Sequence, residues 1–518
     1  MSIVLRKLIT SIQNSIHTMM NQSDSVPTII SIIGTTGVGK SKFSIELAKL
    51  LNGEIINADS MQIYKGADII TNKHPIAERE GIPHHVMNHV NWDEEYYIHR
   101  FKSEAISKIN DITSRGKIPI IVGGTHYYLQ SLLFSNKTIE TANNDQHQSS
   151  IECEVENKDG DESDKDSRLT DEEKKILDGP STELIKHLKS VDPKVAEKFH
   201  PNDTRRIRRA LEIYYLTKIP TSELYSSQKN KEKTETSLRF KTIFFWLYSD
   251  QQILDKRLDE RVDDMMKTGA IMELQDLYDY FKKLNPTPDC ERGIWQVIGF
   301  KEFLPWLTEE SNQKLLHDLK SEVGKATSQN SYDAIMRDND FKTCLEDMKL
   351  RTRRYSRRQV KWIKNLLIPE LNNEAKLGFP LFGKTYLLDA SDLAKWNSQV
   401  KDIGVQICEQ FVTMGKVSED IKQQPDTIEQ ELITLPSSSE DLSELRKLKE
   451  QKWKHYTCDI CTDPDSGDPL IFVGEQFNLH LKSKKHKRVL NKGKRKREYE
   501  EWLALNENKK KETAKRRI

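Results

Sequence analysis

The sequence predicts an α/β fold, in which a P-loop NTPase-like parallel sheet carries a helical insertion domain and a small C-terminal zinc finger. Three observations support this. Short β-branched runs alternate with helical patterns, as in βαβ units. A glycine-rich motif lies between the first such run and the first helix. Near the C-terminus, two cysteines and two histidines follow one another at metal-ligand spacing.

Four segments have the composition of buried strands, and the stretches between them have helical periodicity. We expect strands at 28–34, 54–60, 117–124 and 241–248, and helices at 41–51, 96–115, 182–209 and 250–284. Strands separated by helices favour a parallel sheet, whose carboxyl ends face a ligand.

Changes in composition divide the chain. Residues 136–170 are polar, acidic and poor in aromatic side chains, which is typical of disorder. The expected parts are an N-terminal arm (1–26), a catalytic core in two pieces (27–135 and 210–396) around a helical insertion (136–209), a linker (397–455), the zinc finger (456–492) and a basic tail (493–518).

The overall composition narrows the class of protein only a little. The 518 residues have a net charge of +1, and no apolar run approaches the roughly 18 residues that span a bilayer, so we expect no membrane segment. Six cysteines, of which four are scattered, do not suggest a disulfide framework and fit a reducing compartment.

The N-terminal arm has features of a mitochondrial transit peptide. It contains Arg6 and Lys7, and no acidic residue precedes Asp24. A frayed basic terminus is an equally good interpretation. Met19 or Met20 could start a cytosolic form, so we expect mitochondrial and cytoplasmic protein, and the basic tail would serve as a nuclear signal.

The glycine-rich motif is a phosphate loop. It matches G-x-x-x-x-G-K-[ST], after a strand and at the start of a helix, where backbone amides and the helix N-terminus bind phosphates. The lysine would meet the terminal phosphate, and the serine hydroxyl can bind Mg²⁺. The loop comprises Gly34, Thr35, Thr36, Gly37, Val38, Gly39, Lys40 and Ser41.

This loop indicates a diphosphate and is of the type that also binds ATP. An ATPase or kinase usually has a metal-binding acid after a later strand, but here that strand ends in Gly123-Gly124-Thr125. The acid lies at the end of the second strand instead, at Asp59, and should project toward the phosphate loop with Ser60 and Gln62 beside it. A strand-end aspartate that only caps a turn is the alternative.

The C-terminal motif predicts a structural zinc site. Cys458 and Cys461 are separated by two residues, His480 and His486 by five, and 18 residues lie between the pairs. This gap exceeds the roughly 12 residues of a DNA-reading finger. Four protein ligands leave no open position for catalysis.

Several ordered motifs together resemble the tRNA dimethylallyltransferase family, also called tRNA isopentenyltransferases. After the phosphate loop come NADSMQIY, GIPHHV, IVGGTHYYLQSLL, HPNDTRRIRRALEIYY, DERVDDMMKTGAIMEL, GIWQVIGFKEF and RTRRYSRRQVKWIKN, over roughly residues 29–365. The zinc motif resembles the eukaryotic branch of this family.

The resemblance implies the reaction. Dimethylallyl diphosphate, bound with Mg²⁺ in the loop, would alkylate the N6 amine of the adenosine 3′ to the anticodon. By resemblance, Asp59 is the general base, Thr35 or Thr36 lines the diphosphate site, and Arg261 stabilises the leaving group, with Thr35 and Arg261 as further catalytic residues. The adenine and nearby RNA would contact residues at the strand ends: Asp59, Ser60, Met61, Gln62 and Thr125.

Two basic segments are expected to contact the tRNA anticodon stem-loop. The segment 351–364 interleaves cations with Tyr355 and Trp362, a combination suited to phosphates and unpaired bases, although a solvated basic face is the alternative on composition alone. The expected contacts are Arg354 and Arg358 in this segment, and Arg205, Arg206, Ile207, Arg208 and Arg209 in the insertion.

Two other functions stay open at this point. A small-molecule or nucleotide kinase would share the phosphate loop, and a non-enzymatic RNA-binding protein could use the loop as a switch. Donor-dependent mass gain on tRNA separates both from a prenyltransferase. We expect a monomer, while the choice of tRNAs and the role of residues 136–170 do not follow from the sequence.

Overall fold

The structure is a computed structural model, and it describes residues 26–135, 169–199, 201, 203–231, 236–284, 290, 292–321, 328–377, 385–414, 455–462 and 469–491. The N-terminal arm, most of the acidic stretch 136–170 and the basic tail lie outside these residues. The chain forms two compact units, one made of 1–138 and 232–435 and the other of 139–231 and 436–518.

The first unit contains a parallel sheet of six strands in the order β3-β2-β4-β1-β5-β6. Strand β1 lies between β4 and β5, so the chain leaves it at a point where neighbouring connections run in opposite directions. The strands are β1 (Thr28–Gly34), β2 (Gly53–Asn57), β3 (His84–His85), β4 (Ile118–Val122), β5 (Lys241–Tyr248) and β6 (Thr385–Asp389).

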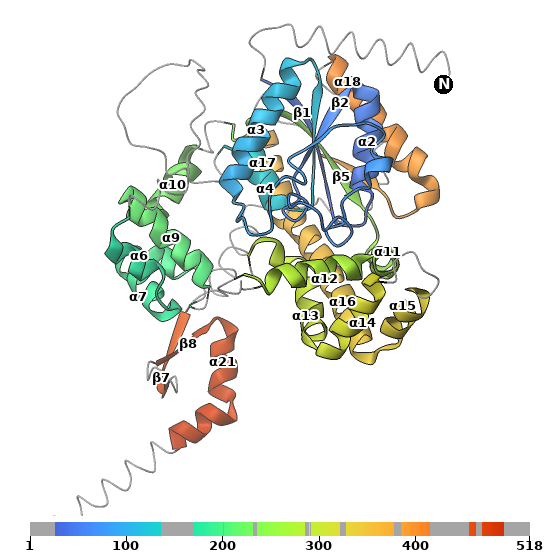
Figure 1. Cartoon of the computed structure of the whole chain (residues 1–518). Coiled ribbons are helices and arrows are strands. Elements are labelled where there is room, and N and C mark those ends of the chain that lie inside the picture. The colour runs from blue at the N-terminus through green and yellow to red at the C-terminus, as the bar shows by residue number, and fades with distance from the viewer. Residues whose placement is uncertain are drawn as a thin grey trace, which may run out of the picture. The chain divides into compact units, whose positions relative to one another are not determined.

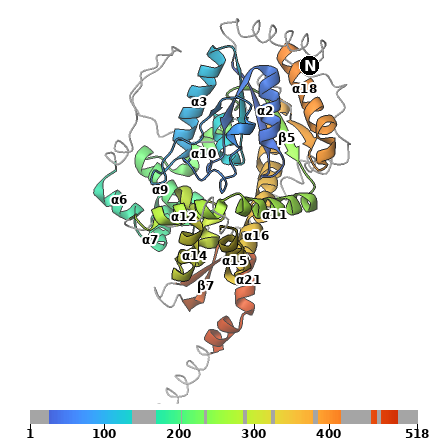
Figure 2. The ribbon, with the colours of Figure 1, turned by 45° about the vertical axis from the view of Figure 1, so that its right-hand side comes forward.

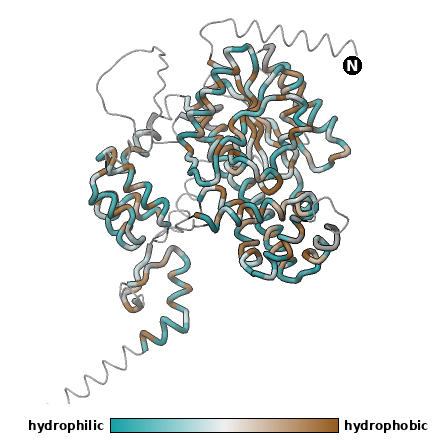
Figure 3. Tube along the Cα trace, in the orientation of Figure 1, coloured by the Kyte–Doolittle hydropathy of each residue, from teal (hydrophilic) through white to brown (hydrophobic). Residues whose placement is uncertain are grey.

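Helices cover both faces of this sheet, as Figures 1 and 2 show for α2 (Lys40–Leu51) and α3 (Ile98–Ser114) on opposite sides. Phe43 of α2 belongs to the core of one face and Phe101 of α3 to the core of the other. Because both faces are buried, the strands are apolar throughout, which is visible as brown tube inside the sheet in Figure 3.

The remaining helices of this unit extend the larger core. They are α4 (His126–Leu133), α11 (Gln251–Lys267), α12 (Ala270–Phe281), α13 (Phe300–Thr308), α14 (Glu310–Ser321), α15 (Ser328–Arg337), α16 (Asn339–Trp362), the π-helix η3 (Ile363–Leu367) and α17 (Ile368–Leu377). Short 3₁₀ turns are η1 (Ile76–Glu78), η2 (Gly293–Gln296) and η4 (Leu393–Lys395).

All four predicted strands are present, but several boundaries were wrong. Strand β2 ends at Asn57, so Asp59 lies in the loop after it. The helix expected over 250–284 is two helices, α11 and α12, which separate at Gly269, where φ is 115° and an L-residue is disfavoured. The edge strands β3 and β6 were not predicted, because such short segments show no clear strand pattern in the sequence.

The expected linker does not begin at residue 397. The π-helix η5 (Asn397–Lys401) and the helix α18 (Asp402–Met414) follow β6, and Ile407 and Cys408 are fully buried in the core that also contains Phe43. The polar character of this stretch hid a single apolar stripe. The later part of the expected linker lies outside the described residues.

The second unit includes a helical region with its own small core. It consists of α6 (Asp171–Leu177), α7 (Ser181–Val191), α8 (Pro193–Ala196), α9 (Thr204–Thr217) and α10 (Thr221–Lys231). The expected helix over 182–209 is therefore three helices, which are separated at Asp192 and between Ala196 and Thr204. The expected boundary at 209 falls inside α9, whose residues Ala210, Leu211 and Tyr215 belong to this core.

The C-terminal part of the second unit is a two-stranded antiparallel sheet, β7 (His455–Thr462) and β8 (Pro469–Val473), followed by α21 (Glu475–Lys482). Tyr456 stacks on Phe477 at 5.1 Å, and Phe472 on His480 at 4.0 Å. These few ring contacts make up little apolar core. Among the described residues of the chain, no helix is both long and apolar enough to cross a membrane.

Candidate active site

The phosphate loop has the predicted position, between the end of β1 and the start of α2. A Cβ on Gly34 would lie 2.5 Å from the carbonyl oxygen of Leu247, and one on Gly39 would lie 2.7 Å from the ring of Trp396, so both positions require glycine. The amides at the start of α2 have no partner within the helix and are available to an anion. The loop therefore has the form of an anion-binding cradle.

Lys40 lies in this cradle, and its Nζ donates to the carbonyl of Thr35 at 2.7 Å. Burial lowers the pKa of Lys40 to about 8, partly offset by the nearby negative charge of Asp59. A bound diphosphate would stabilise the cation and raise this pKa again. Thr35 is buried, and its hydroxyl oxygen has no hydrogen-bond partner among the described residues.

Arg261 of α11 reaches the same loop, where its Nη1 donates to the hydroxyl of Thr36 at 3.1 Å. Burial lowers the pKa of Arg261 to about 10, while Asp59 acts in the opposite direction. The Nε of Arg261 is buried with no hydrogen-bond partner in the described structure. Two cations and one acid therefore meet at this loop. The cations suit the negative charge of a diphosphate, and the acid can accept a proton.

Asp59 follows β2, and the adjacent Asn57 holds its backbone. The Asn57 side chain accepts from the Asp59 amide at 3.1 Å and donates to the Asp59 carbonyl at 3.1 Å. The Asp59 carboxylate accepts from the Met61 amide at 3.0 Å. Burial raises the pKa of Asp59, opposed by hydrogen bonds from backbone amides and by Lys40. A carboxylate with a raised pKa is a better proton acceptor than an exposed one.

The predicted RNA-contacting residues beside Asp59 take part in the local structure. The Thr125 hydroxyl accepts from the Ser60 amide at 3.0 Å and lies 3.1 Å from the Ser60 hydroxyl, which joins the ends of β4 and β2. The side-chain amide of Gln62 donates to the backbone carbonyls of Thr71 and Asn72 at 3.3 and 3.0 Å. Their roles toward adenine stay predictions.

The phosphate loop, Asp59 and Arg261 line one cavity of about 290 Å³. It brings together residues from the loop, from the ends of β2 and β4 and from α11, among them Thr36, Lys40, Ser41, Asp59, Gln62 and Arg261. Ser41 lies where the motif predicts a magnesium ligand, and hydroxyl and phosphate oxygens are ligands that Mg²⁺ prefers. His74, His84 and Met87 also line the cavity, although the sequence predicted no role for them.

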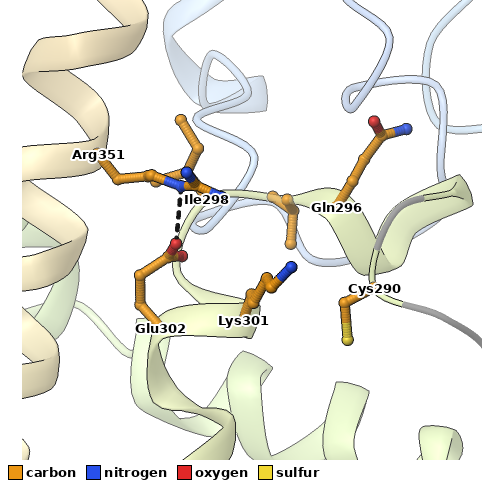
Figure 4. A pocket seen from close by; sticks show the side chains of 7 residues that line it. Cys290, Gln296, Ile298, Lys301, Glu302 and Arg351 are labelled. Carbon is orange, nitrogen blue, oxygen red and sulfur yellow. Dashed lines mark ion pairs between the residues drawn. The ribbon is translucent and has the colours of Figure 1, made fainter. Parts of the chain in front are cut away.

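A second cavity, of about 240 Å³, has different chemistry (Figure 4). Its one carboxylate, on Glu302, pairs with Arg351 at 3.0 Å and accepts from the Gly299 amide at 2.8 Å. The carboxylate is already used to hold α13 against α16. In this cavity the carboxylate is thus paired, whereas at the phosphate loop an acid and two cations line the cavity together.

Two residues of α16 contact the residues that line the cavity near Asp59: Gln359, which the sequence did not single out, and Tyr355, which it predicted only as part of an RNA-contacting segment. Gln359 is buried and bonds both Thr36 and Gly124, and the Tyr355 hydroxyl donates to the Gly124 carbonyl at 3.3 Å. The spacing of four residues within the basic segment was the available signal, since it places both side chains on one helix face.

The arginines of α16 fall into two groups. Arg353 pairs with Asp259 and Arg357 with Asp255, both on α11. Arg354 and Arg358 are exposed, and within the described residues neither has an ion pair. The two arginines that the sequence predicted as RNA contacts are thus the ones whose charge is available to a phosphate.

The predicted contacts on α9 are only partly suitable. Ile207 is fully buried in the core of the helical region, so the prediction that it contacts RNA was wrong, because it lies on the apolar face of α9. Arg206 pairs with Asp203 at 3.3 Å, and Arg208 with Asp178 at 3.0 Å. Arg205 is exposed.

The four predicted zinc ligands do come together. Their ligand atoms all lie within 4.8 Å of one another, and the sulfurs of Cys458 and Cys461 lie 3.6 and 3.5 Å from Nδ1 of His486. Tetrahedral zinc with ordinary Zn–S and Zn–N bonds separates such atoms by about 3.5 Å. His480 Nε2 is 3.1 Å from the same Nδ1. The arrangement fits zinc.

The fold and the cavity define a protein of the phosphate-loop class, with two cations and a buried acid beside the loop. A family model described as IPP transferase matches residues 62–366, and the chain belongs to this family of prenyl-transferring enzymes. The family includes proteins from fungi, animals and bacteria that are similar to this chain.

A Saccharomyces cerevisiae protein named tRNA dimethylallyltransferase is 42% identical, over 92% of this chain and 94% of that protein. A human protein of the same name is 32% identical, over 90% and 86%. One from Anoxybacillus flavithermus is 35% identical, but over only 65% of this chain and 87% of its own length.

A solved structure of a eukaryotic dimethylallyltransferase, described as acting on tRNA, is similar with a TM-score of 0.68 and 40% identity, over 92% of this chain and all of that one. Since the bacterial relative matches a much smaller share of the chain than the eukaryotic ones, about a third of the chain has no counterpart in it.

Proposed function

We propose that this protein transfers a dimethylallyl group from dimethylallyl diphosphate to the N6 amine of the adenosine 3′ to the anticodon of tRNA. The observation that carries the proposal is the meeting of Lys40, Arg261 and Asp59 in one cavity at the phosphate loop. A donor diphosphate would bind the loop amides and both cations, with its dimethylallyl carbon toward Asp59. Membership of the IPP transferase family supports the substrate class.

The reaction follows from these positions. The adenine N6 attacks C1 of the dimethylallyl group, the C1–O bond breaks, and diphosphate leaves with the bonding electrons. The N6 proton passes to Asp59, since the amine becomes acidic as the new bond forms. Proton removal at this stage is worth roughly 10²–10⁴-fold in rate. The loop amides, Lys40 and Arg261 stabilise the charge on the leaving diphosphate.

We also propose Mg²⁺ at the donor site and Zn²⁺ in the C-terminal module. Mg²⁺ would neutralise diphosphate charge, with the Ser41 hydroxyl as the protein ligand. Zinc would be held by Cys458, Cys461, His480 and His486, whose separations fit it. Mitochondrial, cytoplasmic and nuclear locations and a monomeric state are proposals from the sequence.

The kinase interpretation has less support, because β4 is followed by Gly123-Gly124-Thr125, without the acid that would bind a nucleotide-associated metal. The test is to incubate the protein with total tRNA, Mg²⁺ and labelled dimethylallyl diphosphate. We expect label in RNA and a mass gain of one dimethylallyl group per modified adenosine. ATP turnover without RNA, and no label transfer, would favour the kinase.

A further inference from the structure

Gln359 joins two parts of the cavity that are far apart in the sequence. Its Oε1 accepts from the Thr36 amide at 2.9 Å, and its Nε2 donates to the Gly124 carbonyl at 2.9 Å. Thr36 belongs to the diphosphate loop, and Gly124 follows β4. One carboxamide from α16 therefore connects the expected donor site to the strand end beside Asp59.

The orientation of this carboxamide is set by its partners. One partner is an N–H and the other a C=O. A flipped amide would place its NH₂ group against the Thr36 N–H and its oxygen against the Gly124 carbonyl. Gln359 is only 3% exposed, which makes loss of either bond costly, since the freed group stays buried. The bridge is therefore specific in direction as well as in position.

The absence of a side chain at Gly124 makes room for the bridge. A Cβ at this residue would lie 2.6 Å from Nε2 of Gln359 and 3.3 Å from Oδ2 of Asp59. The backbone of Gly124 also provides a hydrogen bond to the Asp59 carboxylate, which helps to oppose the rise in its pKa. Gly124 therefore contacts the bridge through its carbonyl and the acid through its backbone amide.

Gln359 does not compete with a diphosphate for the loop. It binds the amide of Thr36, whereas the free amides at the start of α2 lie from Lys40 onward. Holding Thr36 in place also fixes its hydroxyl, which accepts from Arg261. Preorganised donors of this kind cost no reorganisation during the reaction.

We propose that Gln359 is a positioning residue, which sets the phosphate loop and the Asp59 carboxylate in register so that donor and base act on the same adenine amine. The inference rests on the proposed transfer reaction and adds a residue to it. Gln359 need not touch either substrate. It acts through Thr36 on the donor side and through Gly124 on the side of the base.

The test compares Gln359→Met with Gln275→Met. Methionine keeps the length of the side chain and removes both hydrogen bonds. Gln275 is also a buried glutamine, 6% exposed, and bonds Asp279 and Gln313 at 3.0 and 2.8 Å without lining the cavity. It therefore reports what loss of a buried amide does to stability alone.

For Gln359→Met we expect kcat to fall at least tenfold and the KM for dimethylallyl diphosphate to rise, with the KM for tRNA changed less than twofold. Gln275→Met should keep all three constants within twofold at a comparable loss in Tm. A merely structural role of Gln359 predicts equal behaviour of the two variants, and that result would overturn the proposal.

Gln359→Glu gives a second readout and serves if the methionine variant does not fold. The carboxylate can still accept from Thr36 but, when ionised, cannot donate to Gly124. Asp59 is faced by Lys40 of α2, Arg261 of α11 and Tyr355 of α16. A new negative charge among these groups should move the acid limb of the kcat–pH profile upward. An unshifted limb with wild-type kcat contradicts the bridge.

Failure of this inference and failure of the proposed function look different. If wild-type protein transfers no dimethylallyl group to tRNA, the proposed function is wrong. If wild-type protein is active and both Gln359 variants match it in kcat, donor KM and acid limb, only the role of Gln359 is wrong.

Discussion

The phosphate-loop site and the C-terminal Cys/His module hold their functional side chains by different means. At the phosphate loop, apolar strands and helices on both sheet faces fix the backbone, and hydrogen bonds between elements then place Asp59, Lys40 and Arg261. Among the described residues of the module, two strands and a helix are joined by a short β-ladder and a few ring contacts. The geometry of the module should therefore depend on a bound metal, whereas the geometry of the phosphate-loop site depends on packing.

This difference predicts which substitutions reduce activity while the fold is kept, and which substitutions unfold part of the protein. A side chain at the phosphate loop can be altered with little loss of fold, because the core around it stays intact. A ligand of the module cannot, because the binding free energy of a structural zinc is largely folding free energy, on the order of 10–16 kcal/mol in small modules.

The largest effect is expected from Asp59→Asn. The amide cannot take a proton, so kcat should fall by roughly 10²–10⁴-fold while the donor still binds. Single-turnover transfer of labelled donor to tRNA measures the loss, and the Tm and zinc content should match wild type. A kcat within twofold of wild type would remove Asp59 from the role of base.

Cys461→Ser, or removal of metal by a chelator, should unfold the module and leave the phosphate-loop site folded. We expect loss of one bound zinc per chain, a KM for tRNA raised about tenfold by loss of basic phosphate contacts, and kcat changed less than twofold. Metal analysis and steady-state kinetics check both. A protein without zinc at the start, or a fall in kcat with KM unchanged, would contradict the comparison.

The pH dependence of kcat/KM for the donor should carry the mark of Lys40. Its pKa in the free protein is lowered by burial to about 8, so it is a cation below that pH and loses its charge as the pH rises through it. Donor capture should weaken by about tenfold per pH unit above that point. Lys40→Arg should move this alkaline limb upward, whereas the zinc-ligand variant should leave it in place.

Arg354→Ala and Arg358→Ala should each weaken tRNA binding several-fold and lower the salt slope of the affinity by about 1. Arg357→Ala is the matched control, since Arg357 lies on the same helix but pairs with Asp255. Titration of an anticodon stem-loop at several salt concentrations gives the slopes. Equal slopes for all three variants would show that pairing does not decide which arginines contact RNA.

The smallest effect on catalysis is expected from deletion of residues 1–19. This arm precedes β1, so kcat and KM should stay within twofold of wild type while import into isolated mitochondria is lost. Unchanged import of the shortened protein would contradict the transit-peptide interpretation and support that of a frayed basic terminus.

Local chemistry in the sequence determined the strands with buried β-branched runs, the phosphate loop, the acid after the second strand and the four zinc ligands. Each depends on neighbours in the chain: glycines that allow a tight loop, a lysine and serine at a helix start, ligand pairs at fixed spacing. The resemblance of ordered motifs added the substrate class. The same reasoning misplaced the end of the helical insertion, which falls inside α9, and the start of the linker, where α18 adds buried residues to the core.

Only the tertiary structure decided which side chains meet across long separations. Arg261 reaches Thr36, 225 residues away, and Gln359 reaches it from 323 residues away. It also separated Arg354 from Arg357, which the sequence shows as equal members of one basic run, because only Arg357 pairs with an acid of α11, Asp255, within the described residues. Pairing and burial between distant segments are set by how helices pack on the sheet, and no local pattern encodes that packing.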